Sequence, residues 1–371
     1  MTTPLQIDGR QGGGQLLRSA LTLSLLTGRP FQIGDIRGAR PRPGLKRQHL
    51  TCVRAALAIS GGTAEGAAPG SSDLRFTPGA VTAGDHEFRI DGAGSTSLVL
   101  QTVLLPLLQA DGVSRLRLQG GTHNPLAPTF DYLDRVFLPR LRAMGARVEL
   151  ELVRAGFMPA GGGAIECRIE GPTDWRPLDQ ATAPDAGDRS PPTLRLLVRH
   201  AHLKPEIVRR AVAAARASLA ETTGHHGHQD AGAALEVIDQ PHPDALCGGL
   251  ALVVEAEPTG TGHRAEPADL RAQTTAFGGR GIRAEQLGQQ AARAMRQHLA
   301  AGEPVDLQLT DQLLLPLLVG GGQFRAAGAT AHTRSNAGLI DAFRPDRLQL
   351  IPTEDRRLLV RVDDPLPAGQ P

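Results

Sequence analysis

The chain has 371 residues and is 40% hydrophobic, so it can bury a real core over two or three domains. A net charge of +2 creates no overall electrostatic field that would attract nucleic acid or a membrane. With only 3% aromatic residues, the chain is unsuited to binding long single strands by stacking their bases. Three dispersed cysteines without a CxxC pair, no signal-like start and no membrane-length apolar run predict a cytoplasmic protein without a membrane segment.

The first predicted helix follows the glycine-rich stretch DGRQGGGQLLRS at residues 8–19. Three glycines before a helix either form a backbone N–H cradle for phosphate, with Arg18 one turn further on, or a tight turn that needs glycine. Both interpretations stay open at this point. The spacing fits neither a Walker loop nor a dinucleotide-binding fingerprint.

A basic loop at residues 36–47 leads into the second predicted helix. It carries Arg37 and Arg40, and Gln48 and His49 follow it. Prolines and glycine keep this backbone irregular, and arginine forks suit phosphate. A solvated basic loop is the alternative.

The same layout of apolar helix, glycine turn and strand occurs at residues 16–36, 97–121 and 311–328. An amphipathic helix follows each, in 45–66, 129–150 and 335–352. Gly28 and Gly112 are 84 residues apart and Gly62 and Gly145 are 83 apart, which indicates an internal repeat. The third turn comes 208 residues after Gly112, so about 120 residues are additional.

The additional residues predict a small inserted α/β domain. A Pro/Ala/Asp-rich connector at 179–192 precedes a strand at 193–201, a helix at 206–220 and strands near 233–239 and 250–257. We predict an α/β (α+β) protein whose large domain comprises residues 1–179 and 283–371, with 180–282 as the insert. Its histidine-rich loop has no standard metal spacing and favours a polar surface loop; it contains His225, His226 and His228.

His332 lies in the stretch GATAHTRSNAG near the end of the chain. A single histidine in a polar segment is more often structural than reactive. The rest of the sequence decides between these interpretations.

Several segments together resemble the RNA 3′-terminal phosphate cyclase family. They are GGGQLLRSALTLSLLTG, RPGLKRQHL, GAGSTSLVLQTVLLPLL, GGTHNPLAP, GFMPAGGG, TDQLLLPLL and AHTRSN, in the family's order over nearly the whole chain outside the insert. The resemblance implies three βαβαββ units with a small inserted α/β domain. It also implies ATP-dependent conversion of an RNA 3′-phosphate to a 2′,3′-cyclic phosphate, with release of AMP and pyrophosphate.

The resemblance further implies that His332 is the nucleophile and carries AMP through nitrogen. A neutral imidazole is a competent nucleophile near pH 7. The substrates are then ATP and RNA 3′ ends, with Mg or Mn as divalent metal. By match to the family, the phosphates of RNA or nucleotide contact Arg18, Arg37, Arg40, Gln48 and His49. The ATP contacts are Gln101, Pro128, Tyr132, Gln308, Leu309, Thr310, Asp311 and Gln312.

The chain departs from the family pattern at three positions. Gln11 stands nearest to the glutamate that relatives place near nucleotide and metal, and a neutral amide is a weaker metal ligand. Gln308 replaces an aromatic residue, and His123 stands where relatives often have Asp.

Two alternatives remain. A non-catalytic RNA-binding member of the same fold would lack His332. An enolpyruvyl transferase would need lysines around its anionic substrates, and Lys46 and Lys204 are the only lysines here.

Overall fold

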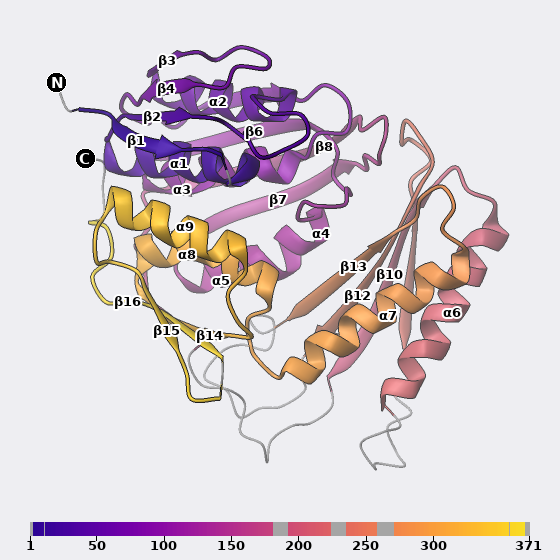
Figure 1. Ribbon diagram of the computed structural model, residues 1–371. Coiled ribbons are helices and arrows are strands. Elements are labelled where there is room, and N and C mark those ends of the chain that lie inside the picture. The colour runs from indigo at the N-terminus through magenta and orange to yellow at the C-terminus, as the bar shows by residue number, and fades with distance from the viewer. Residues whose placement is uncertain are drawn as a thin grey trace.

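The computed structural model describes residues 3–10, 12–180, 192–223, 235–257, 271–355 and 357–367. They form a mixed α/β fold with four four-stranded sheets, which confirms the predicted fold class at this level. Figure 1 shows a larger body built from the two ends of the chain and a smaller unit beside it. Gln11 and the three clustered histidines, His225, His226 and His228, lie outside the described residues.

The first sheet has the order β1-β2-β4-β3, with β1 parallel to β2 and β4 antiparallel to β2 and β3. Helix α1 is leucine-rich on most faces and is buried along most of its length, as its composition predicts. It ends at Gly28, whose left-handed φ of 67° suits glycine. The elements are β1 (Leu5–Asp8), α1 (Gly13–Thr27), β2 (Phe31–Gly34), α2 (Arg47–Ser60), β3 (Thr63–Glu65) and β4 (Leu74–Thr77).

The second sheet repeats this arrangement with the order β5-β6-β8-β7. Its second helical segment, where one amphipathic helix is expected, contains a five-residue π-helical turn between two α-helical pieces. The elements are β5 (Asp85–Arg89), α3 (Thr96–Gln109), β6 (Gly112–Gly120), α4 (Phe130–Tyr132), η1 (Leu133–Phe137), α5 (Leu138–Ala143), β7 (Arg147–Arg154) and β8 (Gly163–Gly171).

The third sheet has the corresponding order, β9-β14-β16-β15. Its first strand, β9 (Leu178–Gln180), pairs in parallel with β14 although more than a hundred residues separate them, because the smaller unit lies between. The other elements are α8 (Leu307–Gly320), β14 (Gly322–Ala326), α9 (Ala331–Phe343), β15 (Gln349–Pro352) and β16 (Leu358–Val362).

The smaller unit is one sheet, β11-β10-β12-β13, covered by two packed helices (Figure 1). Helix α7 shares the core of this unit through Leu287, Ala291 and Met295. Helix α7 begins after residue 282 and packs against α6, β12 and β13 of this unit. The elements are β10 (Thr193–Ala201), α6 (Pro205–Thr223), β11 (Glu236–Pro241), β12 (Gly249–Glu257), β13 (Ala272–Phe277) and α7 (Ala284–Ala301).

Buried ion pairs join the smaller unit to the main body. Nη2 of Arg199 lies 2.6 Å from Oδ1 of Asp131, and Nε2 of His123 lies 2.9 Å from Oδ2 of the same carboxylate. Burial alone would raise the pKa of Asp131, but these two partners outweigh it and hold the pKa well below its usual range. Arg135 and Glu255 form a second link of 3.1 Å.

One hydrophobic core runs through the three related sheets and their helices. Leu17 of α1, Leu104 of α3 and Leu314 of α8 are each at most 1% exposed. The described helices include none long and apolar enough to cross a membrane.

Candidate active site

His332 is the second residue of α9, and its side chain is exposed. The helix begins there because Thr330 is its N-cap, and the Oγ1 of Thr330 accepts a hydrogen bond of 2.9 Å from the backbone N–H of Thr333. The bond is reciprocal, because Oγ1 of Thr333 accepts a hydrogen bond of 2.9 Å from the backbone N–H of Thr330. The predicted polar segment is therefore the first turn of a helix.

Asp311 of α8 ties this turn to the neighbouring helix. Oγ1 of Thr330 lies 2.9 Å from Oδ1 of Asp311, and the Thr333 hydroxyl also donates to that carboxylate. Burial raises the pKa of Asp311, while the two hydroxyl donors and the nearby His332 imidazole act in the opposite direction. Asp311 and His332, both predicted site residues, are thus brought together.

Helix α9 runs parallel to α1. Oγ of Ser19 donates to Oδ1 of Asn336 at 2.9 Å, about midway along both helices. Where both helices end, Nη1 of Arg29 donates to the carbonyl of Phe343 at 2.5 Å. The N-terminus of α1 therefore lies at the same end as His332, and Figure 1 shows α1, α9 and α8 next to one another.

The glycine-rich loop and the basic loop meet at the start of α1. A β-carbon at Gly14 would collide with Nε2 of His49, so glycine lets the imidazole lie directly on this turn. A β-carbon at Gly13 would lie 3.4 Å from Nη2 of Arg40. The structure thus brings two predicted phosphate-binding side chains onto the first turn of α1.

His49 is neutral over the ordinary pH range. Burial, together with the charges of Arg18, Arg37 and Lys46, lowers its pKa to about 3. Its Nδ1 accepts the backbone N–H of Lys46 at 3.1 Å, so Nε2 carries the proton and can donate. Burial also lowers the pKa of Arg18. The start of α1 therefore presents donors and positive charge, as an anion site requires.

Arg37 has a different setting from the other predicted phosphate ligands. Its backbone has a φ of 58°, and its Nη1 donates to the carbonyls of Arg42 and Gly44 at 2.7 and 3.1 Å. The side chain shapes the basic loop that carries Arg40.

Two glutamines link helix α3 to the helices on either side of it, α2 and α8. Oε1 of Gln48, at the start of α2, accepts the backbone N–H of Ser95, the N-cap of α3, at 2.9 Å. Nε2 of Gln101, in α3, donates to Oε1 of Gln312, in α8, at 2.7 Å. Both are predicted site residues; Gln48 joins the starts of α2 and α3, and Gln101 joins the second turns of α3 and α8.

A closed ring of contacts, made in the N-terminal halves of the helices, therefore joins α1, α2, α3, α8 and α9. His49 joins α2 to α1, Gln48 joins α2 to α3, Gln101 joins α3 to α8, Asp311 joins α8 to α9, and Asn336 joins α9 to α1. Helix N-termini carry partial positive charge and free N–H groups. We call this ring the N-terminal ring; His332 is on it.

The remaining predicted ATP contacts differ in exposure. Gln308 is exposed, whereas Leu309 and Thr310 are buried, with exposures of 1% and 0%. Pro128 is buried, and its carbonyl accepts the Ser97 hydroxyl. Tyr132 is 3% exposed, and its hydroxyl lies 3.4 Å from Oδ2 of Asp306. Their roles toward ATP stay predictions.

The residues that the structure describes contain no group of three or more His, Cys, Asp or Glu side chains arranged to hold a metal ion. The two carboxylates beside the N-terminal ring, Asp306 and Asp311, already accept hydrogen bonds from the start of α8 and from the two threonines.

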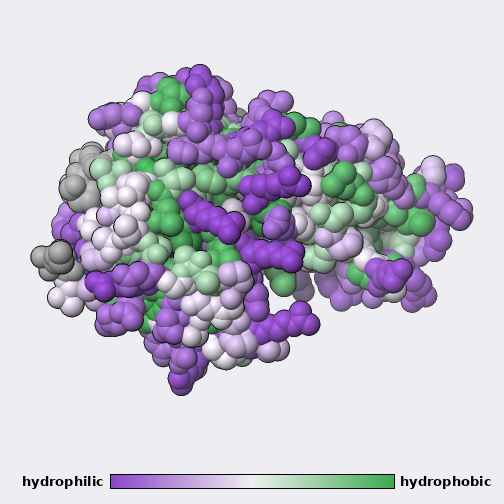
Figure 2. Space-filling view, turned by 90° about the horizontal axis from the view of Figure 1, so that it is seen from above, coloured by the Kyte–Doolittle hydropathy of each residue, from purple (hydrophilic) through white to green (hydrophobic). Residues whose placement is uncertain are grey.

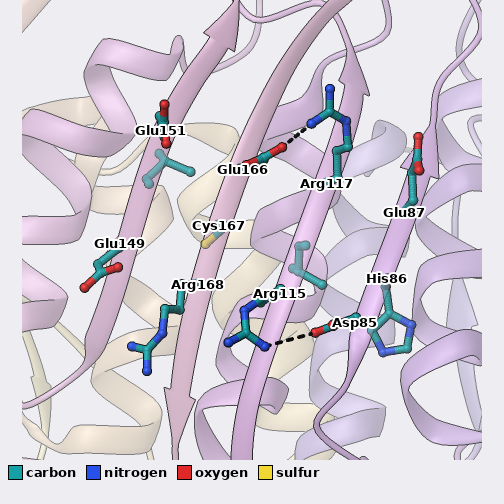
Figure 3. Close-up of a pocket in the computed structure, with 12 residues that line it drawn as sticks. Asp85, His86, Glu87, Arg115, Arg117, Glu149, Glu151, Glu166, Cys167 and Arg168 are labelled. Carbon is teal, nitrogen blue, oxygen red and sulfur yellow. Dashed lines mark hydrogen bonds and ion pairs between the residues drawn. The ribbon is translucent and has the colours of Figure 1, made fainter.

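A hollow of about 680 Å³ lies away from this ring, on the open face of the β5-β6-β8-β7 sheet (Figure 3). Charged side chains alternate along its strands and pair across them, as Arg115 with Asp85 and Arg117 with Glu166. It contains none of the predicted site residues. We interpret it as a solvated sheet face.

Hydrophilic side chains also cover much of the face seen in Figure 2, with hydrophobic residues showing between them.

Sequence reasoning missed the side chains that hold α9 in place, namely Thr330, Thr333, Asn336 and Ser19. Only Thr330 carried a local signal, because threonine is a preferred N-cap residue; the usual capping box has Glu or Gln, not Thr, at the position of Thr333. The pairing of Ser19 with Asn336 had none, since 317 residues separate them.

Two comparisons with known proteins identify the same family. A family model described as RNA 3′-terminal phosphate cyclase matches residues 9–350. Curated RNA 3′-terminal phosphate cyclases are similar to this chain over nearly their full length. The protein from Ectopseudomonas mendocina is 41% identical over 97% of both chains, and the one from Pseudomonas aeruginosa is 43% identical over 93% of this chain and 94% of that one. The protein from Salmonella enteritidis is 40% identical over 98% of this chain and 100% of that one. Among solved structures, the enolpyruvyl transferase NikO from Streptomyces tendae is 17% identical with a TM-score of 0.26, over 45% of this chain and 33% of that one.

Proposed function

The chain belongs to the RNA 3′-terminal phosphate cyclase family, and we propose that it catalyses that cyclisation with ATP, using His332 as the nucleophile. The activity follows from similarity over nearly the full length to curated cyclases. The residue roles are our proposal.

The proposed reaction has three steps. A ring nitrogen of His332 attacks the α-phosphorus of ATP, a P–N bond forms, and the P–O bond to pyrophosphate breaks. An oxygen of the RNA 3′-phosphate then attacks the same phosphorus, and the P–N bond breaks. Finally the neighbouring 2′-hydroxyl attacks the 3′-phosphorus, closes the ring and expels AMP. A covalent adenylate divides one difficult exchange into easier steps.

The observation that carries the assignment of His332 is its exposed position on the N-terminal ring. Several helix N-termini at one place favour the negative charge that ATP and an RNA 3′-phosphate bring. Arg40 and the neutral, donating His49 supply further donors on the first turn of α1. We assign the phosphate-binding role to this part of the ring, together with Arg18, Gln48 and Arg37.

We propose that the nucleotide lies along the start of α8, on the other side of the ring. Gln101 and Gln312 already meet there, and Gln308 is exposed next to them. The buried Tyr132 and Pro128 would then form the floor under the adenine. Leu309 and Thr310, whose side chains are buried, would support this helix from below.

A divalent ion, Mg or Mn, would reach the site with the nucleotide. Magnesium usually keeps several waters and binds through substrate phosphates and one or two carboxylates. This fits a chain whose described residues offer no metal cage and whose Gln11 replaces a carboxylate. When bound, the ion would neutralise charge on the leaving pyrophosphate.

We also propose that the three sheets of equal topology are copies of one βαβαββ unit. They form the large domain, and residues after β9 up to α7 form the insert. The shared strand order supports this division. We place the enzyme in the cytoplasm; its cysteines, Cys52, Cys167 and Cys247, are free, as in a reducing compartment.

Labelling with α-labelled ATP tests the nucleophile. We expect covalent label on the wild type, none on His332→Ala, and normal label on His200→Ala, a histidine of the smaller unit that pairs with Asp239. Retention of label by His332→Ala would refute the assignment. An RNA ending in 3′-phosphate should become resistant to phosphatase; RNA binding without resistance would instead support the non-catalytic alternative.

A further inference from the structure

We propose that Thr330 and Thr333 are positioning residues for adenylate formation: together with Asp311 they fix the first turn of α9 and so fix the imidazole of His332. The inference rests on the proposed function, because it assumes that His332 is the nucleophile. It assigns Asp311 to this task and not to contact with ATP.

The hydrogen bonds of the two hydroxyl groups are complete. Each threonine Oγ1 accepts the backbone N–H of the other residue at 2.9 Å. A hydroxyl has one proton to donate, and in both cases a carboxylate oxygen of Asp311 receives it. Asp311 thereby acts as the common acceptor that holds the reciprocal cap closed.

This arrangement acts on His332 more than an ordinary helix cap would. His332 lies between the two threonines in the same helical turn, and its side chain is exposed. The hydrogen bonds of Thr330 and Thr333 therefore fix the position of the His332 backbone. Thr333 is fully buried and packed, so the turn has little freedom to shift while the three groups stay bonded.

The rest of α9 is anchored elsewhere, which makes the first turn a separate element. Asn336 bonds to Ser19 in α1, and Arg29 holds the C-terminal carbonyls of α9. Loss of one threonine hydroxyl would therefore leave the helix in place and loosen only its first turn. Catalytic geometry is sensitive to this, because a misplacement of about 1 Å can reduce a rate about 100-fold.

The test measures the single-turnover rate of adenylate formation against ATP concentration in the full-length protein. Thr330→Val and Thr333→Val keep the shape of the side chain and remove the hydroxyl. We expect the maximal rate to fall by about 10- to 100-fold, with the half-saturating ATP concentration within about two-fold of wild type. Thr330→Ser and Thr333→Ser keep the hydroxyl and should restore the rate.

Two further variants complete the design. Asp311→Leu keeps the approximate size of the side chain but removes both oxygens that accept from the two hydroxyl groups, so it should be slow like the valine variants. Thr353→Val is the matched control, because Thr353 also donates to an aspartate, Asp355, but in the turn between β15 and β16. Its rate should equal that of the wild type.

The outcomes separate the two hypotheses. Valine variants with a wild-type rate, or with a changed ATP half-saturation alone, would overturn the positioning role. So would slow serine variants with a normal melting temperature, because the hydroxyls would then be irrelevant. Should a valine variant fail to fold, Asp311→Leu and the serine pair decide the question. Label on His332→Ala would instead refute the proposed function itself.

Discussion

Acidification is expected to weaken the fold through His49. Burial first, and then the charges of Arg18, Arg37 and Lys46, lower the pKa of this imidazole to about 3, from an ordinary value of 6.5. Below pH 6.5 the unfolded chain takes up a proton that the native chain does not bind until the pH is near 3. The unfolded state therefore gains stability as the pH falls through this window, and the free energy of unfolding decreases.

The magnitude follows from the size of the shift. Each pH unit in the window is worth about 1.4 kcal/mol, so the loss from His49 is about 2 kcal/mol at pH 5 and about 3 kcal/mol at pH 4. A domain is stable by only about 5–15 kcal/mol, so this single group has a measurable effect.

Urea unfolding at pH 7, 6, 5 and 4 measures it, for the wild type and for His49→Asn. Asparagine keeps an acceptor near the backbone N–H of Lys46 but does not titrate. The difference in unfolding free energy between the two proteins should shift by about 2 kcal/mol in favour of the variant between pH 7 and pH 5. Two curves that stay parallel over this range would show that His49 is not held neutral in the native state.

Three other predictions concern single positions. Asp131→Asn should lower the free energy of unfolding by about 3–5 kcal/mol, because it leaves Arg199 buried without its charge partner. In urea unfolding, the double variant Asp131→Asn with Arg199→Met should recover part of this loss. No recovery would count against the pairing. Gly14→Ala should reduce the rate of adenylate formation, because the added methyl group displaces His49; a normal rate would contradict the role of that turn. Gly338→Ala, in α9 with open space around the new methyl group, should raise stability by about 0.5–1 kcal/mol in a thermal or urea melt, and a loss would mean that the site is not open.

Local features of the sequence were enough for the elements and their repetition. Leucine-rich stretches gave buried helices, because a helix that is apolar on most faces is stable only inside a core. Gly28 and Gly112 marked the ends of corresponding helix–turn segments. His332 and Asp311 were singled out through the resemblance of their motifs to one family, and the comparisons confirm that family.

The boundaries of the insert depended on packing over long distances. Strand β9 is only three residues long, and its partner, β14, comes after the whole smaller unit. Helix α7 has an amphipathic pattern that suits either body, and only its contacts with α6, β12 and β13 assign it to the insert. A pattern in sequence shows that a helix has an apolar face but not which surface covers that face.

The site itself was decided by tertiary structure. The sequence by itself determined which residue types were available: a histidine, arginines, glutamines and an aspartate in recognisable motifs. Only the fold determined that five helices join in their N-terminal halves, that Asp311 accepts from Thr330 and Thr333, and that His49 is neutral. The physical reason is that these properties depend on burial and on contacts between separate helices, which local sequence does not encode.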